Sequence, residues 1–192
     1  MKRIHWKLSS KSEELLVRKY ASETESTASV YCNVRKKDLK ALNSGDGLEA
    51  EDRVIEYAYS VALKASESGY KGDLHLDGGT VLRFGSQRDD YVMGFELATY
   101  KASEADTLLD VDKAVSPCVF VFPFVNAKSG GEIMASLKLL PSKNLKACVL
   151  ELSAFVNEQN KQKYYSELSA FTDALKAMGI TVLTFNGGRY DG

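Results

Sequence analysis

The sequence lacks an excess of charge of either sign. Its 25 lysine and arginine residues nearly balance 26 aspartate and glutamate residues, which leaves a net charge of -1. Such a chain has no overall electrostatic attraction to nucleic acid or to an anionic membrane surface. We therefore expect no nucleic-acid partner, and any charged ligand must be bound by a local patch of side chains.

Long apolar runs, paired cysteines and histidine clusters are also lacking. No stretch approaches the roughly 18 to 20 apolar residues that a membrane span needs, and the polar start is unlike a secretory signal. The three cysteines, Cys32, Cys118 and Cys148, have no C-x-x-C spacing, which is typical of a reducing compartment. With only two histidines, His5 and His75, no histidine-rich metal site can form, and a Cys–His nucleophile pair would need a long-range coincidence.

What the chain does have is an alternation of helical and strand patterns. Its 192 residues, 44% of them hydrophobic, are enough for one domain with a full core. A polar span over 35–51 reads as a long loop, and the acidic stretch that ends at Asp112 reads as a helical or irregular connection. The predicted strands are 28–34, 118–125, 146–156 and 180–188, with a hairpin of two further strands over 73–85. The predicted helices are 52–68, about 87–102 and a short one within 126–140, followed by a long one that carries Tyr164 to Met178 and is ended by Gly179. The helix over about 87–102 has Tyr91, Phe95 and Ala98 on one stripe.

This order predicts an α/β fold of three layers. Strands that alternate with helices form a mostly parallel, twisted sheet with helices on both faces, because right-handed crossovers place them there. The uninterrupted apolar run "CVFVFPFV", 118–125, indicates a strand covered on both faces in the middle of the sheet. The hairpin around Asp77, Gly78 and Gly79 adds one antiparallel strand, so we expect a Rossmann-like architecture.

The opening residues "RIHWKLSSKSEELLVRKY", 3–20, narrow the fold to a family. An α/β domain with one antiparallel strand entered by a hairpin after the first helix resembles the von Willebrand factor A domain. The motif of Ile4, His5, Trp6 and Lys7, followed by small polar residues and a Leu-Val run, resembles the signature of the bacterial "domain of unknown function 58" family. We expect an N-terminal arm over 1–27, attached by packing of Trp6 rather than catalytic, and the A-like domain over 28–192.

The resemblance also implies a cellular setting. Members of that family usually carry hydrophobic membrane segments upstream of the signature and often accompany MoxR-type AAA ATPases. The expectation is therefore a cytoplasmic domain whose parent protein is anchored in the bacterial inner membrane through upstream segments. Its expected partner is a protein, in a MoxR-type AAA ATPase complex.

The same resemblance raises the question of a metal ion. A domains hold a divalent cation with an Asp-x-Ser-x-Ser loop after the first strand and further oxygen ligands from later loops, and such a cation requires hard oxygen ligands. Here the first strand ends in "CNVRKK", 32–37, without a carboxylate, and "FPFVN", 122–126, offers no acidic group. We expect a degenerate metal site that binds no metal, and no other cofactor.

The remaining candidates lie where strands end, at the edge where open α/β sheets bind ligands. We expect a non-catalytic protein-interaction domain that uses the loops 33–47, 126–131 and 153–160. The alternative is an enzyme or small-anion binder that uses the basic residues and a Gly130–Gly131 turn, although "VNAKSGGEIMASL" does not match a phosphate loop and no G-x-S-x-G elbow surrounds Ser153. A solvated loop face is the simpler interpretation of the basic run 35–37. The candidate binding residues are Asn33, Arg35, Lys36, Lys37, Asn126, Lys128 and Ser153.

Overall fold

The computed structural model describes residues 3–4, 17–18, 26–40, 42, 46–102, 117–140 and 145–187. Near the start, β1 (Arg3–Ile4) pairs antiparallel with β2 (Val17–Arg18) in a separate two-stranded sheet. His5, Trp6 and Lys7 lie outside the described residues, as does the acidic connection that ends at Asp112. The predicted packing of the arm and its boundary at residue 27 stay predictions.

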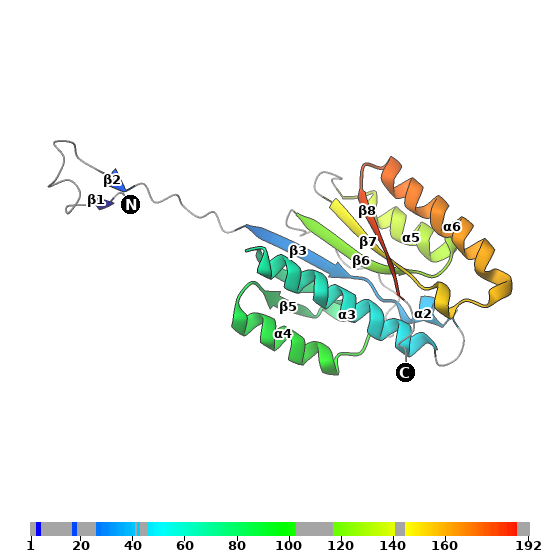
Figure 1. Cartoon of the computed structure of the whole chain (residues 1–192), viewed down its shortest axis with the longest axis horizontal. Helices are drawn as coiled ribbons and strands as arrows, with labels where there is room; N and C mark the ends of the chain where they lie inside the picture. Colours follow the sequence, from blue (N-terminus) through cyan, green and yellow to red (C-terminus); the bar gives the residue numbers. More distant parts are fainter. Residues whose placement is uncertain are drawn as a thin grey trace.

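A six-stranded sheet forms the centre of the molecule (Figure 1), in the order β5-β4-β3-β6-β7-β8. Its strands are β3 (Thr27–Cys32), β4 (Lys71–His75), β5 (Val81–Phe84), β6 (Cys118–Phe124), β7 (Leu145–Glu151) and β8 (Thr181–Asn186). Every neighbouring pair is parallel except β4 with β5. The prediction of a mostly parallel sheet with one antiparallel strand is confirmed.

Helices cover both faces of this sheet, which completes three layers (Figure 1). The helices α3 (Asp46–Glu67) and α4 (Gln87–Thr99) lie on one face, and α5 (Ala127–Leu137) and α6 (Glu158–Ala177) lie on the other. Successive residues of a strand point to opposite faces: Val30 packs in the core beneath α3 and α4, whereas Tyr31 packs in the core beneath α5 and α6. The fold is thus a three-layer, Rossmann-like α/β architecture.

The central strand and the hairpin follow the sequence patterns closely. In β6 every residue but Val119 is buried, and the strand pairs on both sides, as its uninterrupted apolar run predicts. The turn between β4 and β5 is a single 3-10 turn over Asp77–Gly79, in which Gly78 and Gly79 have φ angles of 69° and 81°. Left-handed backbone of this kind favours glycine, which explains the Asp-Gly-Gly sequence.

The prediction of a long loop over 35–51 is wrong. A short helix, α2 (Lys36–Leu39), follows β3 directly, and α3 begins at Asp46, six residues before the predicted start. Two apolar side chains of this largely polar segment are buried: Leu39 is 3% exposed and Ala50 is completely buried. These two side chains pack α2 and the first turns of α3 against the core, so residues 36–39 and 46–51 are helical rather than a loop.

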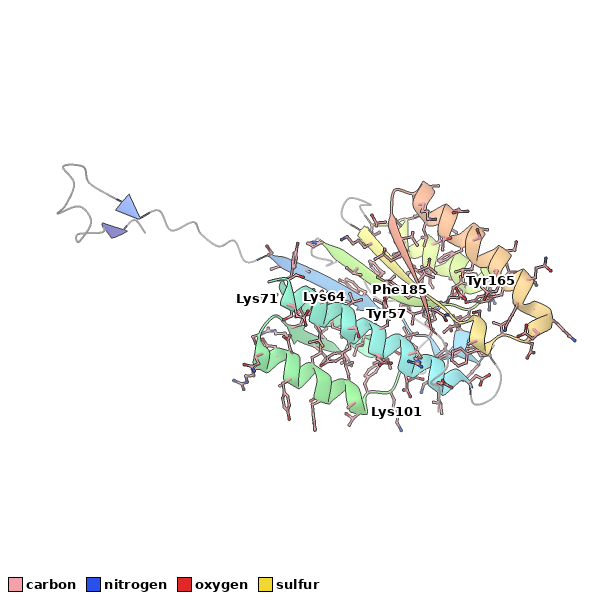
Figure 2. All side chains as sticks on the ribbon, viewed as in Figure 1. Tyr57, Lys64, Lys71, Lys101, Tyr165 and Phe185 are labelled. Atoms are coloured by element: carbon pink, nitrogen blue, oxygen red, sulfur yellow. The ribbon has the colours of Figure 1, made fainter. Side chains whose placement is uncertain are left out.

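Helix α4 and the outer strand β8 leave apolar side chains in solvent. The stripe that contains Tyr91 and Phe95 faces outward, with exposed fractions of 77% and 66%, while Met93 and Leu97 are the buried side chains of α4. On β8, Leu183 is 45% exposed, whereas Phe185 packs against Tyr57 of α3 with ring centroids 4.4 Å apart (Figure 2). The aromatic pattern of α4 therefore does not mark its core side.

Candidate functional site

The loops that leave β3, β6 and β7 meet at one edge of the sheet because the three strands are parallel. The chain proceeds from β3 towards β4 on one side and from β6 towards β7 on the other. The boundary between β3 and β6 is therefore the point where the strand order reverses, and crevices at such points bind ligands in open α/β sheets. We call this region, built by residues 33–40, 42, 125–132 and 151–167, the carboxyl edge.

Arg35 is a buried, ion-paired side chain at the carboxyl edge. It is 2% exposed; its Nε donates to Asp38 Oδ2 at 2.7 Å and its Nη1 donates to Glu132 Oε2 at 2.6 Å. Its carbonyl accepts the amide of Asp38 in the first turn of α2. The solvated loop face expected for the basic run is therefore wrong at this position, because the guanidinium lies inside the protein between two carboxylates.

The pKa values of the two carboxyl groups shift in opposite directions. The hydrogen bond from Arg35, supported by its charge, lowers the pKa of Glu132 below its ordinary value. For Asp38 burial raises the pKa, and the attraction to Arg35 only partly offsets it. The difference follows from solvation, since the side chain of Asp38 is 15% exposed and that of Glu132 is 38% exposed. Lys37 adds a longer contact, with its Nζ 3.6 Å from Glu132 Oε2.

Asn33 lies beside Arg35 and is also buried. Its main-chain amide donates to the carbonyl of Val121 at 2.9 Å, which continues the pairing of β3 with β6. Its side chain is 7% exposed, and within the described part of the chain its Oδ1 has no hydrogen-bond partner. Asn33 is therefore part of the interior rather than of an open loop.

Asn126 and Ser129 form a capping box at the start of α5. Asn126 Oδ1 accepts the amide of Ser129 at 3.0 Å, and the Ser129 hydroxyl lies 3.4 Å from the amide of Asn126. Gly130 and Gly131 follow inside the helix, so the predicted glycine turn is wrong. Gly130 serves packing: a Cβ there would lie 3.0 Å from the ring of Phe171, whereas a Cβ on Gly131 would meet nothing within 4 Å.

Of the other candidate residues, Lys128 is exposed in the first turn of α5, and its charge helps to lower the pKa of Glu132. Lys36 is half-buried in α2. Ser153 is 7% exposed, and its hydroxyl donates to Glu151 Oε1 in a short hydrogen bond. Ser153 thus has a carboxylate partner in place of the histidine that would activate a serine nucleophile.

The cysteines are free and buried. Burial raises the pKa of Cys148 to about 11 and that of Cys118 to about 12, and it raises the pKa of Cys32 further. A thiol reacts as its thiolate, so at neutral pH these three side chains are apolar packing groups. Among the residues that the structure describes, no group of three or more His, Cys, Asp or Glu side chains is placed to hold a metal ion.

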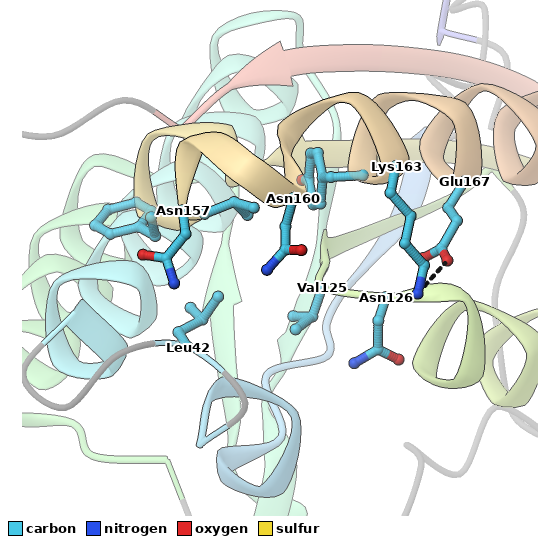
Figure 3. Close-up of a pocket in the computed structure, with 10 residues that line it drawn as sticks. Leu42, Val125, Asn126, Asn157, Asn160, Lys163 and Glu167 are labelled. Carbon is cyan, nitrogen blue, oxygen red and sulfur yellow. Dashed lines mark ion pairs between the residues drawn. The ribbon is translucent and has the colours of Figure 1, made fainter.

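A cavity of about 260 Å³ opens at the carboxyl edge (Figure 3). Its polar members come from the start of α5 and the first turns of α6. Tyr164 in its wall joins β6 to the residue that follows β7, because its hydroxyl donates to the carbonyl of Phe124 and accepts the amide of Leu152. The lining residues are Leu42, Val125, Asn126, Phe155, Val156, Asn157, Asn160, Lys163, Tyr164 and Glu167.

Several of these groups have no distinct signal in the sequence. Glu132 lies 97 residues from Arg35, and no local pattern pairs the two. Lys163 and Glu167 have only their i, i+4 spacing on a helix. Asn157 and Asn160 fall within the predicted loop 153–160, but their common orientation is a consequence of α6, which begins at Glu158.

In comparisons with family models, with curated proteins and with solved structures, nothing matches the chain. Within the described ranges, no helix combines the length and the apolar character that crossing a membrane requires. The function must therefore be argued from the geometry of the carboxyl edge.

Proposed function

We propose that the chain is a non-catalytic protein-interaction domain of the von Willebrand A-like kind, from the "domain of unknown function 58" family, with a degenerate metal site. The observation that carries the proposal is the burial of Arg35 between Asp38 and Glu132. In an A domain the end of the first strand supplies the first metal ligands. In this chain the corresponding position is Arg35, whose guanidinium already forms ion pairs with two carboxylates.

The charges of the cluster explain why a cation does not fit. Two cations, Arg35 and Lys37, face two carboxylates, Asp38 and Glu132, so the cluster has a formal charge of zero. The carboxylates that could bind a metal are held by the guanidinium. At an effective dielectric constant of 20, a unit charge about 4 Å from a guanidinium is repelled by ~4 kcal/mol, and a divalent ion by roughly twice that.

The same geometry weakens the anion-binding or enzymatic alternative. Arg35 makes its strong hydrogen bonds inside the protein, and the Gly130–Gly131 pair is helical. A cradle of loop amides for phosphate is therefore not formed by these glycines. What is left at this edge is a structured surface with a small cavity, which suits contact with another protein.

Calorimetric titration with Mg²⁺ and with Mn²⁺ tests the metal-free part of the proposal. Arg35→Ser is the matched variant, because it removes the guanidinium and leaves both carboxylates. We expect no saturable heat from the wild-type protein. Micromolar binding to wild type that Asp38→Asn abolishes would overturn the proposal.

For the partner we propose a MoxR-type AAA ATPase complex, met by a cytoplasmic domain of a parent protein anchored in the bacterial inner membrane. The support is the resemblance of the opening motif and the surface at the carboxyl edge. Binding of the purified ATPase to the immobilised domain tests this pairing. Absence of binding by the wild-type domain would reject the ATPase as partner.

The location of the interface is tested with two charge reversals on one helix. Lys128→Glu lies in the first turn of α5, at the carboxyl edge, and Lys138→Glu lies just beyond the last turn; both side chains are exposed. The rise of 1.5 Å per residue separates them by about 15 Å. We expect weaker ATPase binding only for Lys128→Glu; equal binding by both variants would move the interface away from α5.

A further inference from the structure

The cavity at the carboxyl edge is lined by asparagine side chains as well as by apolar ones. Asn157 and Asn160 stand three residues apart at the start of α6, which places them on one side of the helix. Figure 3 shows their amide groups directed towards the space above Leu42 and Val125. The cavity therefore combines carboxamide groups on one wall with aliphatic side chains on the opposite wall.

A third carboxamide is held in a fixed orientation. Asn126 also lines the cavity, and its Oδ1 accepts the amide of Ser129 at 3.0 Å. That hydrogen bond occupies the carbonyl oxygen of the Asn126 side chain, which leaves its Nδ2 as the donor available to a ligand. The Asn160 side chain makes no hydrogen bond within the described residues, so both its donor and its acceptor are available to a ligand.

The charged groups of the lining compensate one another. Lys163 Nζ lies 3.8 Å from Glu167 Oε1, and Glu167 Oε2 accepts the amide of Ala127 at 3.1 Å. Tyr164 contributes only its ring, since its hydroxyl is occupied as both donor and acceptor. Lys163 and Glu167 together have a formal charge of zero, so this pair gives a charged ligand no net attraction.

Size and hydrogen bonding then define the occupant. Small-molecule sites usually measure about 300 to 1,000 Å³, so a cavity of about 260 Å³ suits one or two side chains rather than a whole cofactor. A carboxamide offers one acceptor and two donors, which match the donor and acceptor of Asn160 and the Nδ2 donor of Asn126. Its aliphatic stem matches the wall formed by Leu42, Val125 and Phe155.

We propose that this cavity receives the side-chain carboxamide of a glutamine or asparagine from the protein partner. The inference rests on the proposed function, because it specifies how the carboxyl edge recognises another protein. Recognition occurs through paired amide hydrogen bonds and needs neither a metal ion nor an acidic residue on the partner.

The test uses three blocked amino acids of similar size: N-acetylglutamine methylamide, N-acetylglutamate methylamide and N-acetylmethionine methylamide. Each is titrated into the whole chain while the asparagine side-chain amide signals are followed by nuclear magnetic resonance. We expect saturable shifts at Asn157 and Asn160 with the glutamine probe. The glutamate and methionine probes should bind about tenfold more weakly, as expected for loss of one or two hydrogen bonds.

Asn160→Leu is the diagnostic variant, and its control is Gln162→Leu, which is also exposed on the same helix but does not line the cavity. Asn160→Leu should weaken the glutamine probe about tenfold, while Gln162→Leu should leave its affinity unchanged. Equal or tighter binding of the glutamate probe would overturn the inference in favour of an anion site, and no saturable shift with any probe would overturn it outright.

The failure of this inference can be told apart from that of the proposed function. If the probes do not bind but the ATPase does, the carboxamide site is wrong and the interaction domain stands. If the glutamine probe binds as expected and no ATPase binds, the cavity is assigned correctly and the proposed partner is wrong.

Discussion

Replacement of Arg35 by methionine removes the guanidinium and keeps most of the apolar stem. In the native protein this guanidinium is 2% exposed and forms ion pairs of 2.6 Å with Asp38 and with Glu132. The variant leaves two carboxylates without their main partner. Because one of them, Asp38, is largely buried, it cannot regain full hydration in the folded state.

The magnitude follows from the solvation of the two carboxylates. Removing one member of a buried ion pair typically costs about 3 to 5 kcal/mol. Glu132 is more open to water than Asp38, with 38% of its side chain exposed, so we expect a value near the lower limit, ~3 kcal/mol. For a chain of this length that corresponds to a fall in the melting temperature of roughly 6 to 12 °C.

Urea denaturation followed by circular dichroism measures this loss, with Lys37→Met as the matched control. Lys37 contacts the same Glu132 at 3.6 Å but is 36% exposed, so its loss should cost less than about 1 kcal/mol. Below the ordinary pKa of Glu132, 4.5, the difference between wild type and Arg35→Met should shrink, because protonation removes the charge that Arg35 stabilises. A cost for Arg35→Met no larger than that for Lys37→Met would refute this account of the carboxyl edge.

Three further stability changes test other parts of the fold. Gly131→Ala should stabilise the protein by ~0.5 to 1 kcal/mol through helix propensity, whereas Gly130→Ala should lose that gain to crowding against buried rings; stabilisation by both in urea denaturation would contradict the packing role. Tyr164→Phe removes the hydroxyl that bonds the carbonyl of Phe124 and the amide of Leu152 and should cost about 2 to 4 kcal/mol, so a near-neutral result would argue against a stabilising role for these two hydrogen bonds. Desolvation lowers the pKa of His75 below 6.5, so the unfolded chain binds more protons and stability should fall as the pH drops below 6.5; His75→Phe should flatten that slope, and an unchanged slope between pH 5.5 and 7.5 would exclude His75 as its source.

The stacking of His75 explains why that variant keeps an aromatic ring. Its ring lies 4.4 Å from that of Tyr31 at an interplanar angle of 7°, and Tyr31 stacks in turn on Phe120. The three residues are cross-strand neighbours on β4, β3 and β6. Phenylalanine at position 75 preserves this row and removes only the titrating group.

The errors in the prediction of helices have a common physical cause. Residues 46–51 are largely polar, yet Ala50 is fully buried and fixes the first turns of α3 on the core. Gly130 and Gly131 are poor helix formers, yet α5 continues through them because Gly130 lets the helix approach Phe124 and Phe171 closely. In both places tertiary packing outweighs local propensity.

The sequence indicates which residues lie at the carboxyl edge but not how their side chains are arranged there. Strand ends can be read from apolar runs, so residues such as Asn33, Asn126 and Ser153 could be assigned to one edge. Whether a polar side chain there is open or occupied depends on its neighbours in space. Arg35 was expected in a basic loop and lies instead in the interior, against a glutamate 97 residues away.

The sequence by itself determined the order of strands and helices, the central place of β6 and the antiparallel hairpin. These depend on apolar periodicity, on glycine in tight turns and on the handedness of crossovers, all of which act over short stretches of chain. Tertiary structure alone decided the charge and shape of the carboxyl edge. Its ion pairs and its cavity join residues from separate strand–helix units, and their distances are set by packing of the whole sheet rather than by any local pattern.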